Sequence, residues 1–237
     1  MIYILWPTVR PKVMIKRYQQ WLEAAKDPDK IKIRIGVNTS DDAKILKDAG
    51  YKYILVCGNK FRGVAPTSYA LSSQLQVQSK DIVILASDDF CVPNDWDKWL
   101  IEQFKNFDGC LLVDDGIQYG GCVTIPIMTY ACLKRLNHII YHPSYSHLYA
   151  DAELFDNLLK LKLFKDLRKN GKSPLFEHKH YQNGKRPVDK NDKFIVKTCL
   201  HSNKSSKCFN KRMKKNVKLR LIVGDRWKEY AKAAYLI

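Results

Sequence analysis

The sequence DIVILASDDF (residues 81–90) decides the fold class of this chain. The apolar run from Ile82 to Ala86 has the length and composition of a strand that is buried on both faces, as strands of parallel sheets are. Two adjacent carboxylates, Asp88 and Asp89, follow that run directly after Ser87. Because ligands in open α/β sheets gather at the carboxyl ends of the strands, the stretch predicts a parallel sheet with a polar site at this strand end.

Strand-sized apolar runs and amphipathic segments alternate on both sides of this stretch. The runs predict strands at residues 3–6, 31–37, 53–57, 82–86 and 110–113, and the segments between them predict helices near residues 13–25, 40–47, 67–78 and 93–107. Parallel strands joined by crossover helices produce this alternation. We therefore expect a single Rossmann-like α/β domain with a mostly parallel central sheet flanked by helices.

The second half of the chain is less regular. We expect Val123 to Ile127 to continue the sheet, a helix from Ile127 to Leu136, and a longer helix from Ala152 to Leu167. From Lys169 onward lysine, asparagine and serine become frequent, which predicts a partly helical region that folds over the active-site face. The expected division is a catalytic core at residues 1–168 and a basic extension at residues 169–237.

The composition limits the expected binding partners and the expected cellular compartment of the protein. The net charge of +17 in 237 residues favours binding to polyanions such as nucleic acid, acidic polysaccharide or an anionic membrane face, although a lysine-rich proteome would produce the same charge. No apolar run approaches the roughly 20 residues that span a bilayer. Seven cysteines without a CxxC pair are typical of reduced packing residues, so we expect a cytoplasmic protein.

Asp88 and Asp89 suit a divalent metal. Mg²⁺ and Mn²⁺ prefer hard oxygen ligands and keep coordination positions open for phosphate oxygens, so an aspartate pair can hold a diphosphate through the ion. The alternative is a structural role, in which Asp89, Asn94 or Asp95 caps the helix that contains Trp96.

The stretch DIVILASDDFCVPNDW (residues 81–96) resembles the segment of family 2 GT-A glycosyltransferases that carries their D-x-D metal motif, with Ser87 in place of the first Asp. The resemblance implies that Asp89 ligates Mn²⁺ or Mg²⁺. It also implies that Asp88 contacts the ribose or the donor sugar of a nucleotide-sugar.

Earlier segments resemble the nucleotide pocket of the same family. Pro7, Thr8 and Arg10 follow the first predicted strand and would form part of that pocket. Asn38 ends the second strand, where the family more often has an Asp that contacts the base. Asn59 and Arg62 lie in a loop like the family's loop near the uracil and the diphosphate, although Arg62 could equally be a surface arginine.

Later segments resemble the parts of the family that supply the catalytic base and complete the metal shell. Asp151 is the expected catalytic base, and Glu153 is a carboxylate beside it. The alternative is that either residue lies in the first turn of a helix and complements the helix dipole. His178 and His180 are the expected metal ligands, with His178 favoured. The alternative is a pair of surface histidines in a basic loop.

The sequence therefore predicts an inverting, metal-dependent glycosyltransferase that uses a nucleotide-sugar, with a UDP-sugar as the expected donor. Two acceptors fit equally: hydroxymethylated bases of phage DNA, which would place the enzyme in the host cytoplasm, and saccharide or lipid-linked acceptors of surface polysaccharide synthesis. A basic nucleic-acid-binding protein without catalysis is a different class that would also explain the charge. A nucleotidyltransferase fits less well, because residues 7–12 contain no glycine for a phosphate loop.

Overall fold

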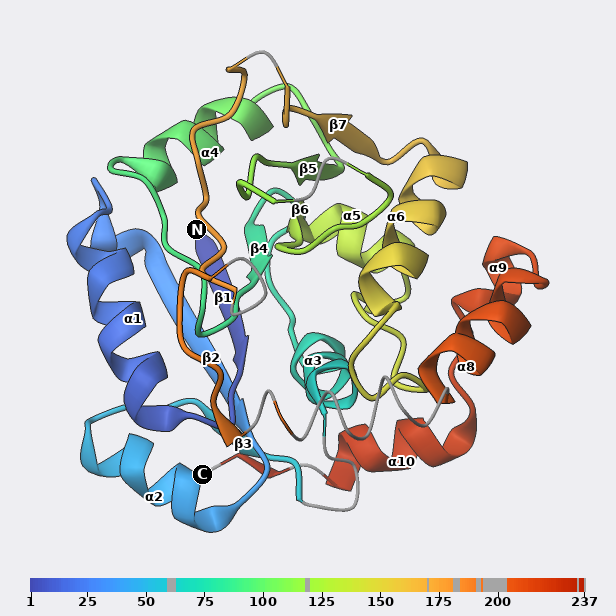
Figure 1. Ribbon diagram of the computed structural model, residues 1–237, viewed down its shortest axis with the longest axis horizontal. Helices are drawn as coiled ribbons and strands as arrows, with labels where there is room; N and C mark the ends of the chain where they lie inside the picture. Colours follow the sequence, from blue (N-terminus) through green and yellow to red (C-terminus); the bar gives the residue numbers. More distant parts are fainter. Residues whose placement is uncertain are drawn as a thin grey trace.

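The computed structural model describes residues 1–58, 63–117, 120–169, 171–180, 184–190, 193, 204–233 and 235–236. A mixed sheet lies at the centre of the described chain (Figure 1). Its strands are β1 (Ile2–Pro7), β2 (Ile31–Val37), β3 (Ile54–Val56), β4 (Ile82–Leu85), β5 (Cys110–Leu112), β6 (Ile127–Thr129), β7 (Phe164–Asp166) and β8 (Tyr235–Leu236). They lie in the order β7-β5-β6-β4-β1-β2-β3-β8.

Helices cover both faces of the sheet (Figure 1). They are α1 (Pro11–Glu23), the short 3-10 helix η1 (Pro28–Lys30), α2 (Ser40–Asp48), α3 (Val64–Ser73), α4 (Trp96–Phe104), α5 (Tyr130–Arg135), α6 (Ala150–Leu161), α8 (Lys204–Met213), α9 (Val217–Arg220) and α10 (Asp225–Ala233). In the described part of the chain, none of these helices is long and apolar enough to cross a bilayer.

The strands β3, β2, β1 and β4 run parallel, so their carboxyl ends meet at one edge of the sheet. β6 is antiparallel to both β4 and β5, and β8 is antiparallel to β3. The sheet is thus mostly parallel with antiparallel additions, and the predicted α/β fold class is confirmed.

Alternation along the strands divides the core into two layers. Ile2, Ile4 and Trp6 of β1 pack with α1, α2 and α4, whereas Leu5 faces the opposite layer with α3, α5 and α6. Gly36 of β2 permits one close approach, because a Cβ at this position would collide with the side chain of Thr67 in α3. The strand ends are therefore held in place from both sides.

The predicted strand at Val123 to Ile127 was wrong, since β6 begins only at Ile127 and leads directly into α5. Val123 and Ile125 are buried, but their segment is a loop. The backbone N–H of Val123 donates to the carbonyl of Asp151 at 3.3 Å instead of to a neighbouring strand. The apolar run correctly predicted that Val123 and Ile125 are buried, but buried residues need not form a strand.

The predicted helix from Ala152 to Leu167 was too long. α6 begins at Ala150 and ends at Leu161, where Lys162 adopts a left-handed conformation with φ of 55°. The chain then enters β7, which pairs with β5. No glycine or proline marks this turn in the sequence, so the helical pattern concealed a short strand.

The region after Lys169 is partly helical, as predicted, and contributes α8, α9 and α10. It also supplies β8, which extends the sheet beyond β3 and was not foreseen. Residues 171–180 run along the end of β4: the N–H of Lys179 donates to the carbonyl of Asp89 at 2.7 Å, and Phe90 and His178 form an antiparallel bridge. Residues 178 and 179 therefore lie against Asp89 and Phe90.

Candidate active site

Asp88 is buried at the end of β4, and both of its carboxylate oxygens accept hydrogen bonds from the first strand and the residues that follow it. Trp6 Nε1 donates to Oδ1 at 2.9 Å, while Thr8 Oγ1 and Arg10 Nε each donate to Oδ2 at 3.0 Å. Burial raises the pKa of Asp88, and the charge of Arg10 opposes that rise. The carboxylate therefore positions the predicted nucleotide-pocket residues Thr8 and Arg10, beside Pro7 at the end of β1.

Arg10 also connects this pocket to the C-terminal extension. Its Nη1 lies 2.9 Å from Asp189 Oδ2, and Arg186 Nη1 lies 4.0 Å from the same oxygen. The other nitrogen of Arg186, Nη2, lies 3.5 Å from Asp89 Oδ2. Two guanidinium groups thus lie at the end of the sheet, where they can contact the oxygens of a diphosphate.

Asp89 follows Asp88 but has a different environment. It accepts a hydrogen bond from the Ser87 hydroxyl, and its Oδ2 lies 3.8 Å from His178 Nε2. Burial would raise the pKa of Asp89, but His178, the Ser87 hydroxyl and the charge of Arg10 together hold the pKa well below its usual range. Asp89 is therefore a carboxylate that stays ionised. It does not cap α4, whose N-cap residue is Asp95 without a side-chain cap.

His178 is fixed beside Asp89 by its neighbours. Its ring stacks on Phe90 with centroids 4.2 Å apart, and its backbone N–H donates to the carbonyl of Asp115 at 3.0 Å. The ring of His180 lies 5.1 Å from that of His178. His178 therefore lies next to Asp89, and the ring of His180 packs against the ring of His178.

A carboxylate oxygen and an imidazole nitrogen form a donor set that suits Mn²⁺. The described residues contain no group of three or more His, Cys, Asp or Glu side chains placed to hold a metal ion. Asp89 and His178 thus fit a metal that takes its remaining ligands from a bound diphosphate and water, and do not fit a closed structural site.

Asp151 lies in the first turn of α6, and its Oδ1 accepts a hydrogen bond from the N–H of Ala152 at 2.9 Å. Cys122 lies close enough to this carboxylate to act on its pKa. Burial raises the pKa of Asp151, against the opposing effects of the backbone N–H of Ala152, of Cys122 and of His178. The carboxyl group therefore has a raised proton affinity, and it lies within electrostatic range of His178.

Asp115 is a buried residue of the site that the sequence analysis missed. Its Oδ2 accepts from Thr124 Oγ1 at 2.5 Å, and its carbonyl accepts from the backbone of His178. Asp115 thereby connects the loop before β6 to the segment that contains His178. Asp114 and Asp115 follow β5 as Asp88 and Asp89 follow β4, and that repeated signal of paired aspartates after a buried strand could have found it.

Glu153, two residues after Asp151, is fully engaged. Arg212 of α8 donates to both of its oxygens, at 2.7 Å and 2.6 Å, and Tyr145 donates its hydroxyl to Oε2 at 2.7 Å. The carboxylate is 2% exposed. Glu153 therefore holds α8 against α6 and is poorly placed to accept a proton from a substrate.

Asn38 lies buried at the end of β2, and its Oδ1 has no hydrogen-bond partner among the described residues. A buried acceptor of this kind is available to a ligand N–H. Asn59 and Arg62, the other two residues predicted for the nucleotide pocket, lie outside the described residues.

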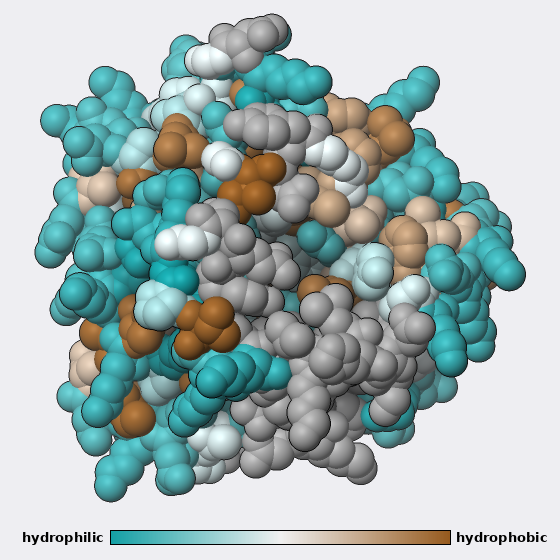
Figure 2. All heavy atoms as spheres, in the orientation of Figure 1, coloured by the Kyte–Doolittle hydropathy of each residue, from teal (hydrophilic) through white to brown (hydrophobic). Residues whose placement is uncertain are grey.

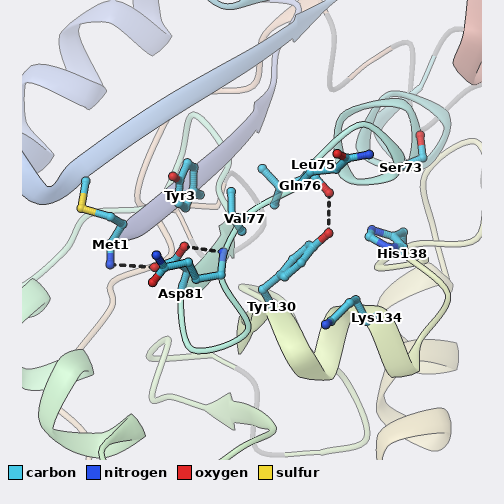
Figure 3. Close-up of a pocket in the computed structure, with 11 residues that line it drawn as sticks. Met1, Tyr3, Ser73, Leu75, Gln76, Val77, Asp81, Tyr130, Lys134 and His138 are labelled. Carbon is cyan, nitrogen blue, oxygen red and sulfur yellow. Dashed lines mark hydrogen bonds and ion pairs between the residues drawn. The ribbon is translucent and has the colours of Figure 1, made fainter.

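A cavity of about 640 Å³ lies at the opposite edge of the sheet (Figure 3). Met1 and Asp81, which precede β1 and β4, line it together with Tyr130 and Lys134 of α5. Tyr130 donates its hydroxyl to the carbonyl of Leu75 at 2.7 Å across this cavity. None of the predicted site residues lines it, so it is separate from the strand-end site.

Comparison with known proteins addresses the fold. The crystal structure of Staphylococcus aureus TarS residues 1–349 superimposes with a TM-score of 0.52 at 14% sequence identity. The chain has a mixed α/β fold of the Rossmann-like GT-A type. The match covers 71% of this chain and 58% of that TarS structure. No protein-family model and no curated protein matches the sequence.

Proposed function

We propose that this GT-A protein is a metal-dependent inverting glycosyltransferase that transfers a sugar from a nucleotide-sugar to an acceptor hydroxyl. The observation that carries the proposal is the placement of two kinds of carboxylate at one edge of the sheet. Asp89 stays ionised beside His178, and Asp151 has a raised proton affinity nearby. Sugar transfer needs both carboxylates close together. An ionised carboxylate holds the metal that binds the donor diphosphate, and a carboxylate of raised proton affinity takes the proton of the acceptor hydroxyl.

The proposed donor is a UDP-sugar. The free acceptor oxygen of Asn38 suits the imide N–H of a uracil base, which is a hydrogen-bond donor. Arg10 and Arg186 offer guanidinium groups to the diphosphate, and Asp88 orients the first of them. When bound between Asp89 and His178, Mn²⁺ or Mg²⁺ would neutralise charge on the leaving diphosphate.

Asp151 is the proposed base. As the acceptor oxygen attacks the anomeric carbon, its proton passes to the carboxylate of Asp151. The bond between the anomeric carbon and the diphosphate oxygen breaks on the opposite side, and its electron pair leaves with the diphosphate. Attack opposite the leaving group inverts the configuration, and a single carboxylate suffices for this step.

The proposed acceptor is a hydroxyl on a saccharide or lipid-linked molecule, with hydroxymethylated DNA as the alternative acceptor for the same chemistry. The lysine-rich C-terminal extension suits either polyanion. Exposed aliphatic side chains beside those lysines favour the lipid-linked class.

A transfer screen tests the proposed function. The protein is incubated with Mn²⁺, UDP- and GDP-sugars, and either oligosaccharides, undecaprenyl-linked saccharides, hydroxymethylated DNA or plain DNA; released nucleotide and product mass are measured. We expect nucleotide release with a UDP-sugar, and a mass gain of one sugar on one acceptor class. Absence of turnover and of binding with every donor would overturn the proposal.

A further inference from the structure

The outer side of α8 and α9 combines lysines with aliphatic side chains in a way that folding does not require. We propose that this surface docks onto an anionic lipid bilayer. We call it the basic apolar surface and define it by exposed residues of the segment 211–222: Lys211, Lys214, Lys215, Lys218, Leu219 and Ile222. The inference concerns binding and holds whether or not the proposed sugar transfer is correct.

The inner side of the same segment already makes the contacts that hold it to the core. Arg212 pairs with Glu153 of α6, and Arg220, which is fully buried, donates to Asp156 of α6 at 2.6 Å. Leu221 and Val223 are buried in the main core. These inward contacts hold the segment to the core. The exposed lysines and aliphatic side chains are not needed for that packing, so they are available to bind a partner.

The charges of the basic apolar surface are not balanced locally. No Asp or Glu occurs from Lys204 to Gly224. None of the four lysines pairs with a carboxylate of another described residue. Each such lysine gains free energy near an anionic lipid surface, and several together make that attraction appreciable.

The aliphatic side chains decide between a bilayer and a nucleic acid. Leu219 is 50% exposed and Ile222 is 57% exposed, and both lie within a few residues of Lys215 and Lys218. A phosphate backbone would need only the cations. An interfacial membrane segment needs both, because its apolar side chains enter the region below the headgroups while its lysines meet the phosphates.

The position of the surface suits an acceptor carried by the bilayer. In Figure 1, α8 and α9 lie beside α6, and in Figure 2 hydrophilic side chains with paler apolar ones among them cover this right-hand edge. Phe209 of α8 stacks on Tyr149, two residues before Asp151, with ring centroids 5.3 Å apart. Docking through this surface would therefore bring the Asp151 side of the molecule towards the lipid headgroups.

Vesicle co-sedimentation of the full chain tests the proposal. The vesicles contain phosphatidylcholine alone or phosphatidylcholine with phosphatidylglycerol, and no donor is added, so the result does not depend on sugar transfer. We expect binding only to the phosphatidylglycerol vesicles. In the triple variant Lys214→Gln, Lys215→Gln, Lys218→Gln the affinity should fall about a hundredfold, since each lysine contributes about a fivefold effect.

Two further variants separate membrane docking from general charge. Leu219→Ser with Ile222→Ser keeps the charge and should weaken vesicle binding about tenfold. The matched control Lys44→Gln, Lys52→Gln, Lys98→Gln removes three exposed lysines elsewhere and should leave binding within about twofold.

Two outcomes would overturn the proposal. One is absence of binding to phosphatidylglycerol vesicles. The other is vesicle binding that the serine variant leaves unchanged, together with duplex DNA binding that the lysine variant abolishes, which would assign the surface to nucleic acid. Thermal unfolding of each variant confirms that any loss reflects the surface and not the fold.

Discussion

Asp151 and Glu153 lie two residues apart in the first turn of α6, and their surroundings give them opposite properties. Glu153 meets a guanidinium group on both oxygens and a tyrosine hydroxyl, so its hydrogen-bonding capacity is largely used by the protein. Asp151 meets a backbone N–H and a thiol, and burial raises its pKa. Saturation by fixed hydrogen-bond partners thus separates a structural carboxylate from a chemically available one.

The same contrast separates Asp88 from Asp89. Three donors from the first strand and the residues just after it saturate Asp88, whereas the carboxylate of Asp89 faces His178 and Arg186 across distances of 3.8 Å and 3.5 Å. We therefore expect substitutions of Glu153 to act on folding, those of Asp88 to act on the placement of Thr8 and Arg10, and those of Asp89 and Asp151 to act on chemistry.

The largest expected effect belongs to Asp89. Asp89→Asn should reduce the transfer rate by on the order of a thousandfold, because the metal that stabilises the leaving diphosphate loses its charged ligand. EDTA should reduce wild-type transfer to a similar extent, with recovery on addition of Mn²⁺. The exposed Asp41→Asn serves as the matched control and should retain activity. Full activity in EDTA would contradict the metal assignment.

The next effect concerns stability at Glu153. Glu153→Gln leaves Arg212 as a buried charge without its partner, so the free energy of unfolding should fall by about 3–5 kcal/mol. Urea unfolding monitored by tryptophan fluorescence measures this change. The isosteric Asp151→Asn, in which no ion pair is broken, should change the same quantity by less than about 1 kcal/mol. Equal losses of unfolding free energy in the two variants would contradict the distinction between a structural Glu153 and a chemically available Asp151.

A smaller effect follows from His142 within the Glu153 cluster. The N–H of Ser144 donates to His142 Nδ1, and His142 Nε2 lies 3.2 Å from the carbonyl oxygen of Ile222 and 3.1 Å from Arg212 Nη1. Burial, helped by the charge of Arg212, lowers the pKa of His142 from 6.5 to about 4. The unfolded chain thus binds a proton between these pH values that the folded chain does not.

This contribution to stability is therefore complete above about pH 6.5 and is lost as the pH falls towards 4, by up to about 3 kcal/mol. Urea unfolding of the wild type at several pH values should show this decline. In His142→Gln the decline should be shallower, because the group that takes up the proton is gone. An unchanged slope in the variant would assign the decline to other groups.

The smallest effect belongs to Cys122. Its thiol lies beside the carboxyl group of Asp151 and lowers the pKa of that group. Cys122→Ala should move the acidic limb of the pH–rate profile to higher pH, because a base with a higher pKa is protonated at a higher pH, and Cys122→Ser should restore it. The change in rate at neutral pH should stay below about tenfold. Coincident profiles for all three proteins would show that the thiol does not act on the base.

The strands with a clear local pattern were predictable from the sequence. The run IKIRIGV gave the limits of β2, and the run before Ser87 gave β4 to within one residue. β7 and β8 were not predictable. β7 follows α6 without a break in the helical pattern, and both strands are stabilised by pairing with distant partners, β5 and β3, which local periodicity does not encode.

The candidate site was predictable in part for the same reason. Strand ends and a family resemblance indicated Asp89, Asp151 and His178 before their distances were known. The sequence did not indicate that Glu153 is engaged by the protein, because its partner is Arg212, 59 residues away. The pairing of Asp88 with Trp6, Thr8 and Arg10 likewise joins residues about 80 positions apart.

The role of Asp151 as the base is tested by comparing Asp151→Asn with the wild type, in both sugar-transfer rate and affinity for the UDP-sugar in Mn²⁺. We expect transfer to fall about a hundredfold to ten-thousandfold, with donor affinity and unfolding free energy nearly unchanged. Transfer that survives undiminished, or a donor affinity that falls in step with the rate, would contradict the assignment of Asp151 as the base.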